Sequence, residues 1–144
     1  MNREQIFSYL EERFGLDKGL FKDYEFLEGA KGRVFMATKD VSNVSKAVKA
    51  VIVGLLFCRV NGSVKLSGNI TQLFGNNATK SVVNISELEA RKFIGGEDLD
   101  VPDTGTTDGY VIVKYKNYPL GIGLLKESAI KNMIPKAKRT NLVA

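Results

Sequence analysis

The sequence predicts an α+β protein composed of two small mixed units, each dominated by antiparallel strands. Two amphipathic helix patterns, several runs of apolar–polar alternation beside short turns, and a central cluster of turn formers support this prediction. Hydrophobic residues make up 44% of the 144 residues and charged residues 26%, which are globular values. The turn formers at residues 75–79 place a boundary between units at 1–75 and 80–144.

The first predicted element is a helix over residues 2–14. Ile6, Leu10 and Phe14 recur one turn apart and would form its buried face. Asn2 is suited to the N-cap, and Gly15 stands where helices often end in a left-handed residue.

A hairpin and a buried strand follow this helix. The stretch YEFLEGAKGRVFMAT alternates apolar and polar residues on both sides of residues 29–32, which predicts two strands and a turn. The apolar run KAVIVGLLFCRV predicts a strand buried on both faces, with a bulge at Gly54. Asn61 and Gly62 predict a turn, and VKLSGNITQLFG a short strand and a helical turn.

The second unit begins with a strand in KSVVNIS and a helix in ELEARKFI. Ser86 and Glu89 have the spacing of a capping box, and Gly95 with Gly96 would end the helix. An acidic, turn-rich loop precedes a hairpin formed by YVIVKY and YPLGIGLLK, and residues 130–134 predict a last strand or turn.

The residue types exclude several kinds of chemistry. The chain has no histidine, which excludes imidazole-relayed nucleophiles and most zinc sites. Its one cysteine, Cys58, lies in an apolar run and is interpreted as a buried hydrophobic residue. GNNATK is not a phosphate-binding loop, and no apolar run is long enough to cross a membrane. We therefore expect a cytoplasmic protein that is not an enzyme and needs no cofactor or metal.

Positive charge is concentrated near the end of the sequence. The net charge is +5, yet residues 84–109 carry two Lys/Arg against seven Asp/Glu, whereas residues 110–144 carry seven against one. Such asymmetry is typical of a face that meets a polyanion, most often nucleic acid, although a solvated basic end gives the same count.

Residues 80–139 resemble a known RNA-binding domain. The motifs FIGGEDL, GYVIVKY, YPLGIGLLK and IKNMIPKAKR are similar to the PUA-like domain at the C-terminus of RsmF/Sun-type RNA cytosine methyltransferases, and to short archaeal ribosome-biogenesis relatives. The resemblance implies a partly closed β-barrel with a capping helix, following a small N-terminal α/β unit. Residues 1–75 are faintly similar to the N-terminal domain paired with PUA in another ribosome-biogenesis family. Met133 and Ile134 depart from the His and Tyr that relatives often have, and Asn117 replaces a common turn glycine.

The family motif Lys-Asn, two residues, Pro-Lys, two residues, Arg is filled by Lys131, Asn132, Pro135, Lys136 and Arg139. The resemblance implies that RNA contacts come from the basic side chains, a directional amide, an exposed ring and glycines that permit close approach. The candidate RNA-binding residues are Lys131, Asn132, Lys136, Lys138, Arg139, Gly121, Gly123, Tyr118 and Lys126. Ile130 and Ile134 would plug the barrel.

Other roles remain open for several of these residues. Gly121 and Gly123 could instead relieve crowding at a barrel bend, Asn132 could cap the local backbone, and Tyr118 could cover the barrel edge. Arg91 and Lys92 could extend the basic face, or pair with Glu87 and Glu89 along the helix. The acidic loop lacks the regular spacing of a calcium site and would keep RNA from the wrong face.

Three hypotheses follow. The chain could be a non-catalytic protein that binds structured rRNA or tRNA during ribosome biogenesis or RNA modification, with ribosomal precursor particles as partners. Alternatively it could be the substrate-binding subunit of an RNA methyltransferase acting in trans. The third hypothesis is an interaction protein whose basic end has no RNA role.

Overall fold

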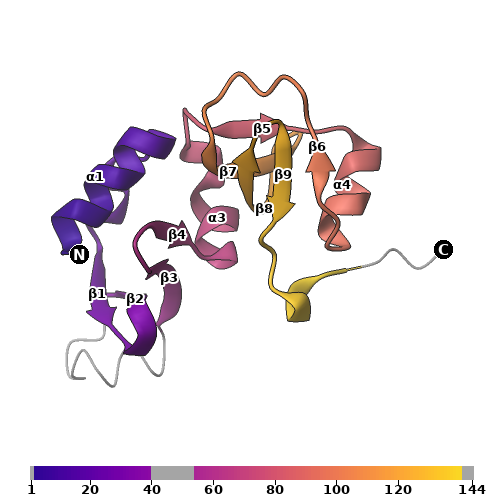
Figure 1. Ribbon diagram of the computed structural model, residues 1–144. Helices are drawn as coiled ribbons and strands as arrows, with labels where there is room; N and C mark the ends of the chain where they lie inside the picture. The colour runs from indigo at the N-terminus through magenta and orange to yellow at the C-terminus, as the bar shows by residue number, and fades with distance from the viewer. Residues whose placement is uncertain (1, 40–53, 141–144) are drawn as a thin grey trace. The chain divides into compact units, whose positions relative to one another are not determined.

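The structure is a computed structural model that describes residues 2–39 and 54–140 (Figure 1). By their contacts the residues divide into two compact units, 1–70 and 71–144. The predicted domains, 1–75 and 80–144, remain a prediction. The described residues contain no helix long and apolar enough to cross a membrane.

The first unit packs helices on an antiparallel sheet. Its helices and 3-10 turns are α1 (Arg3–Phe14), η1 (Lys18–Phe21) and η2 (Ala30–Gly32), and α3 (Gly68–Phe74) spans the division between the units. Its strands are β1 (Tyr24–Glu28), β2 (Arg33–Thr38), β3 (Leu55–Val60) and β4 (Val64–Leu66), paired in that order. The predicted first helix, the hairpin and the turn at Asn61 are confirmed.

Local capping explains where α1 begins and ends. The Asn2 side chain accepts a hydrogen bond from the backbone N–H of Gln5 at 2.9 Å, and the Gln5 side chain accepts one from Asn2 N at 2.9 Å. Gly15 ends the helix with φ 66°, in the left-handed region. The buried face of α1 meets an aromatic core, in which the Phe7 and Phe57 ring centroids lie 6.3 Å apart.

The strand predicted in KAVIVGLLFCRV is described from Leu55, and residues 49–53 lie outside the described residues. Burial of both faces holds only for Phe57 and Cys58, because Leu55 is exposed. The predicted bulge at Gly54 stays a prediction, because Gly54 precedes the described strand and adjoins residues outside the described ones. A bulge is found at Phe57, which has no partner between the Val34–Cys58 and Phe35–Leu56 pairs. The extra residue turns the Phe57 ring into the aromatic core.

We expect Cys58 to resist alkylation in the folded protein. The side chain is fully buried, and burial raises the pKa of its thiol to about 12. Iodoacetamide in neutral buffer should therefore leave it unmodified, whereas the chain unfolded in guanidinium should react at the rate of an ordinary thiol. Mass spectrometry of the two samples makes this comparison, and rapid labelling of the folded chain would contradict the burial.

The second unit has a five-stranded sheet that curls into a partly closed barrel (Figure 1). Its strands are β5 (Val82–Asn84), β6 (Leu99–Asp100), β7 (Gly109–Tyr115), β8 (Tyr118–Lys126) and β9 (Ala129–Asn132), in the order β5-β7-β8-β9-β6. The β5–β7 pair is parallel and the others are antiparallel. The helix α4 (Glu87–Ile94) caps the barrel, and the 3-10 turns are η3 (Gly75–Asn77) and η4 (Lys136–Lys138).

The barrel core lies between α4 and one face of the sheet. Phe93 and Ala90 of α4 pack with buried residues of the strands, among them Val111, Val113 and Ile130. The capping box predicted for α4 is confirmed: Ser86 Oγ accepts from Glu89 N at 3.2 Å, and Glu89 Oε1 accepts from Ser86 N at 3.0 Å. The predicted α+β class with a partly closed barrel is therefore correct.

Candidate functional site

Residues 131–139, here called the basic segment, are tied to the barrel at both ends. The first two residues belong to β9, and Met133 N donates to Ile122 O of β8 at 3.2 Å. Just beyond the segment, Thr140 N donates to Ile94 O at the end of α4, at 2.7 Å. The backbone of the segment therefore has a defined course over the barrel.

Asn132 joins the basic segment to the end of α4. Its side chain is 6% exposed, and its Nδ2 donates to Phe93 O at 2.6 Å and to Glu97 O at 2.9 Å. Its Oδ1 accepts from Ile134 N at 2.9 Å. These bonds use both amide hydrogens and the amide oxygen in satisfying backbone groups, which leaves little of the side chain for a base. The local-cap interpretation fits Asn132, and sequence patterns gave no sign of its distant partners.

Asp98 is a further member of the site that sequence analysis did not single out as a binding residue. Its Oδ1 accepts a hydrogen bond from the backbone N–H of Asn132 at 2.8 Å. One carboxylate of the acidic loop thus fixes the start of the basic segment through a hydrogen bond to its backbone. The FIGGEDL motif contains Asp98, but a contact to a residue 34 positions away has no local signal in the sequence.

Gly121 and Gly123 are needed for internal packing. A Cβ on Gly121 would lie 3.0 Å from Ile134 Cγ1, and one on Gly123 would lie 2.3 Å from Ile130 Cγ2. Both glycines are buried, and both isoleucines pack in or against the barrel core, as predicted for plugs. Relief of crowding therefore accounts for the two glycines, and neither presents an open surface to a ligand.

Arg139 is held against the end of α4 by its aliphatic stem. Its Nε donates to Ile134 O at 3.1 Å. A Cβ on Gly96 would lie 2.5 Å from Arg139 Cδ, and the φ of Gly96 is +101°, which side chains rarely adopt. Gly96 therefore creates the space that the Arg139 side chain occupies.

We expect Gly96→Ala to destabilise the protein by about 0.5–1.5 kcal/mol more than Gly105→Ala, because the Arg139 side chain must move away and give up its hydrogen bond to Ile134 O. Gly105 is a matched control, since its φ is +68° and a Cβ there would meet nothing within 4 Å. Chemical denaturation of each variant in the wild-type and Arg139→Ala backgrounds measures the coupling. Equal destabilisation by Gly96→Ala in both backgrounds would show that this contact carries no energy.

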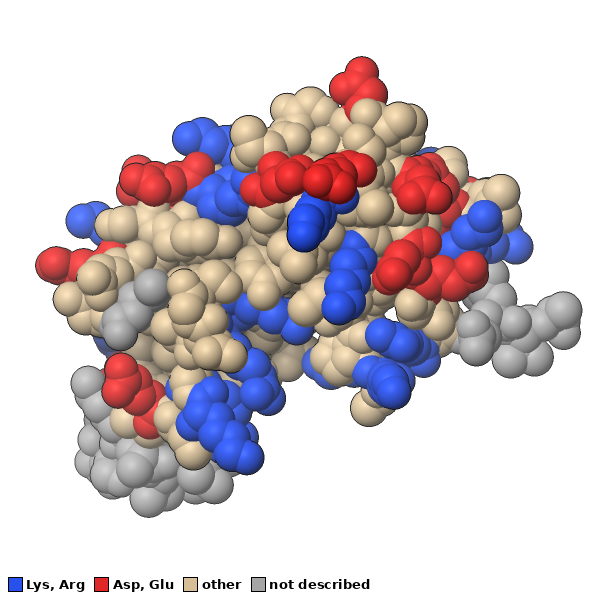
Figure 2. Space-filling view, viewed as in Figure 1, with Lys and Arg blue, Asp and Glu red and all other residues tan. Residues whose placement is uncertain are grey.

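The charged ends of the basic segment are exposed. Lys131, Lys136, Lys138 and Arg139 all face solvent, and Figure 2 shows lysine and arginine side chains over this part of the chain. Among residues 2–39 and 54–140, no carboxylate pairs with Lys131 or Lys136. Their charge is therefore available to an anion.

Lys126 and Tyr118 lie at opposite ends of β8. Eight residue steps separate them, a distance of about 26 Å along an extended strand. Lys126 shares a face of the sheet with Lys131, because Lys126 pairs with Ala129 and Leu124 pairs with Lys131. Tyr118 is 66% exposed beside the hairpin turn. The two residues cannot both belong to one compact contact with Lys131.

Two other charged residues of the barrel, Arg91 and Asp108, have partners within the barrel. Arg91 forms the predicted i,i+4 pair with Glu87, at 3.0 Å, with both side chains largely exposed. Asp108 accepts from Glu127 N at 3.3 Å. In the part of the chain that the structure describes, no group of three or more Asp, Glu or Cys side chains could hold a metal ion.

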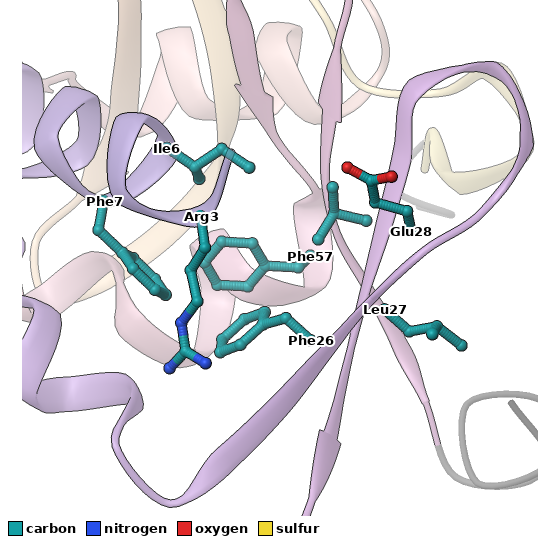
Figure 3. A pocket seen from close by; sticks show the side chains of 8 residues that line it. Arg3, Ile6, Phe7, Phe26, Leu27, Glu28 and Phe57 are labelled. Atoms are coloured by element: carbon teal, nitrogen blue, oxygen red, sulfur yellow. The ribbon is translucent and has the colours of Figure 1, made fainter. Parts of the chain in front are cut away.

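A small apolar pocket lies in the first unit, with a volume of about 120 Å³ (Figure 3). The Arg3 guanidinium carbon lies 5.3 Å from the Phe7 ring centroid and 5.0 Å from that of Phe26. Figure 3 shows the Arg3 side chain extended along these rings, with Phe57 behind them. The arrangement favours cation–π attraction that closes this edge of the aromatic core.

Comparison with known proteins supports the resemblance in the second unit. The family described as the methyltransferase RsmF PUA domain matches residues 80–140. Similar curated proteins include ribosomal RNA small subunit methyltransferase F of Aeromonas salmonicida, 35% identical over 63 residues, and that of Shewanella sp. strain ANA-3, 30% identical over 73 residues. Residues 80–140 thus form a PUA-like domain that resembles the C-terminal domain of RsmF.

These matches cover 44% and 51% of this chain, but 13% and 15% of the two methyltransferases. The matched portion is the PUA domain and not the catalytic domain. The likeness therefore concerns one domain of larger enzymes.

Proposed function

We propose that this chain is a non-catalytic RNA-binding protein, which recognises structured rRNA or tRNA through its PUA-like domain. The observation that carries the proposal is the basic segment, which is fixed to the barrel by Asn132 and Thr140 while its cations remain exposed. Because the backbone that carries these cations is already ordered, binding to phosphates costs little backbone entropy. The relatives are named as acting on small-subunit ribosomal RNA, so this RNA is the first to test.

The contact surface that we propose consists of Lys131, Lys136, Lys138 and Arg139, with Lys126 on the same sheet face as Lys131. These side chains would contact phosphates, which contribute affinity without sequence discrimination. Tyr118 would form a separate stacking contact, because it is exposed at the other end of β8. Asn132, Gly121 and Gly123 position this surface from inside the barrel.

The absence of catalysis is part of the proposal. Cys58 is the one cysteine in the chain, and with a pKa of about 12 its thiol carries almost no thiolate at neutral pH. The chain has no histidine to act as a base. Binding in ribosome assembly or RNA modification is therefore the function we assign, either alone or as the substrate-binding subunit of a methyltransferase acting in trans.

The proposal is tested by the affinity of the full chain for small-subunit rRNA and for total tRNA, measured at several salt concentrations. If four phosphates are contacted, log K should fall against log[salt] with a slope of about −2.8 to −3.6. An affinity that does not change with salt concentration, or no binding to either RNA, would overturn the proposal. Affinity capture from lysate separates the two forms: a methyltransferase in stoichiometric amount supports action in trans, and ribosomal particles alone support the independent protein.

A further inference from the structure

Three cationic residues lie side by side on three neighbouring strands of the first unit's sheet. Arg33 of β2 pairs with Arg59 of β3, and Arg59 pairs with Lys65 of β4. We call these three residues the cation row. The next set in register, Val34, Cys58 and Leu66, is buried in the core. Because side chains alternate between the two faces of a sheet, the cation row lies on the face turned away from that core.

The cation row works against stability. Like charges directly opposite each other on a sheet repel, and burial together with the charge of Arg59 lowers the pKa of the Lys65 ammonium group. Among the described residues, no carboxylate forms an ion pair with any of the three side chains. A repulsive row with no ion-pair partner among the described carboxylates favours a role in binding an anion.

Arg33 is already oriented. Its Nε donates to Ala30 O at 3.0 Å, and its guanidinium carbon lies 5.6 Å from the centroid of the Phe35 ring. The ring in turn covers Gly29, where a Cβ would lie 2.7 Å from Phe35 Cε2. The guanidinium is thus held by a backbone bond and an aromatic face, while its terminal nitrogens stay available as a fork of donors.

We propose that the cation row is a second contact surface for the phosphate backbone of RNA, separate from the basic segment. This inference rests on the proposed RNA-binding function. Neighbouring strands place the Cα atoms of the three residues about 5 Å apart in a line. Their long side chains can therefore reach consecutive anionic groups on one chain. The guanidinium groups of Arg33 and Arg59 can each donate two hydrogen bonds to phosphate oxygens. Contacts to the phosphate backbone carry no sequence information, so charge alone is sufficient for them. An acidic protein segment is the competing occupant.

The test replaces Arg59 and Lys65 with glutamine in the full chain and measures binding of a fluorescein-labelled stem-loop RNA across a salt series. Loss of two phosphate contacts should make the slope of log K against log[salt] shallower by about 1.4–1.8. Lys18→Gln/Lys22→Gln removes the same charge from exposed positions outside the sheet of this unit and should change the slope by less than half as much. Arg59→Gln alone should reduce it by about 0.7–0.9, and this single variant carries the test if the double variant is unfolded.

Stability supplies a second readout. Removing cross-strand repulsion should raise the thermal midpoint of Arg59→Gln/Lys65→Gln above that of the wild type at low salt, while RNA binding weakens. A wild-type slope in the variant would overturn the cation row as an RNA contact, and binding of an acidic peptide instead of RNA would identify the competing occupant. If the wild-type chain binds no RNA, the proposed function fails as well. If Lys131→Gln/Lys136→Gln weakens binding and Arg59→Gln/Lys65→Gln does not, only the cation row fails.

Discussion

Replacing Asn132 with alanine is expected to lower the free energy of unfolding by about 2–4 kcal/mol and to weaken RNA binding at the same time. The change leaves Phe93 O, Glu97 O and Ile134 N without their partner, in a region where Asn132 is 6% exposed. An unsatisfied buried polar group costs about 1–3 kcal/mol, and water entering the new space would recover part of this loss. Urea denaturation measures the effect.

Two further substitutions sharpen this prediction. Asn84→Ala removes an amide from an exposed position on β5 and should change the unfolding free energy little. Asn132→Asp keeps the size but removes the amide donors and sets a carboxylate against two carbonyl oxygens. It should therefore destabilise at least as much as alanine. If Asn132→Ala and Asn132→Asp both unfold with the wild-type free energy, as the control Asn84→Ala should, Asn132 does not hold the basic segment.

Removing the exposed charges of the basic segment should produce the opposite pattern, in which affinity falls and stability does not. Lys131→Gln/Lys136→Gln is expected to weaken binding of small-subunit rRNA by on the order of tenfold at physiological salt. The slope of log K against log[salt] should become shallower by about 1.4–1.8. Neither side chain pairs with a described carboxylate, so the unfolding free energy should stay near that of the wild type.

Fluorescence anisotropy in a salt series measures the affinity, and thermal unfolding monitors the fold. Lys18→Gln/Lys22→Gln serves again as the charge-matched control, since a smaller net charge alone weakens binding to any polyanion. Equal losses in both double variants would attribute the effect to net charge. Collapse of the fold in Lys131→Gln/Lys136→Gln would show that the basic segment is structural.

Elements with a strong local signal could be predicted from the sequence. Ser86 and Glu89 specify the start of α4 within four residues, and the hairpin of β7 and β8 follows from alternation around a two-residue turn. Ile134 could be predicted as a plug because an apolar residue among cations needs a core to occupy, and it packs against the barrel core.

Features that depend on distant partners could not be predicted. The two-residue strand β6 shows no periodicity and exists because Leu99 pairs with Ile130. The bulge at Phe57 depends on the register of β3 against β2, where Gly54 offered the more visible local signal. The role of Asn132 likewise rests on carbonyls 35 and 39 residues earlier in the chain.

The central claim is that residues 131–139 form a fixed RNA-binding surface, and an NMR titration of the ¹⁵N-labelled full chain with small-subunit rRNA fragments tests it most directly. We predict that the backbone amides of Lys131, Lys136 and Lys138 already have chemical shifts well away from random-coil values in the free protein, as ordered residues do. Their resonances, together with that of Arg139, should shift as RNA is added, while those of Asp103 and Gly105 in the acidic loop should stay in place. Averaged random-coil resonances for the segment, or RNA-induced shifts that leave all four amides unchanged, would contradict the account.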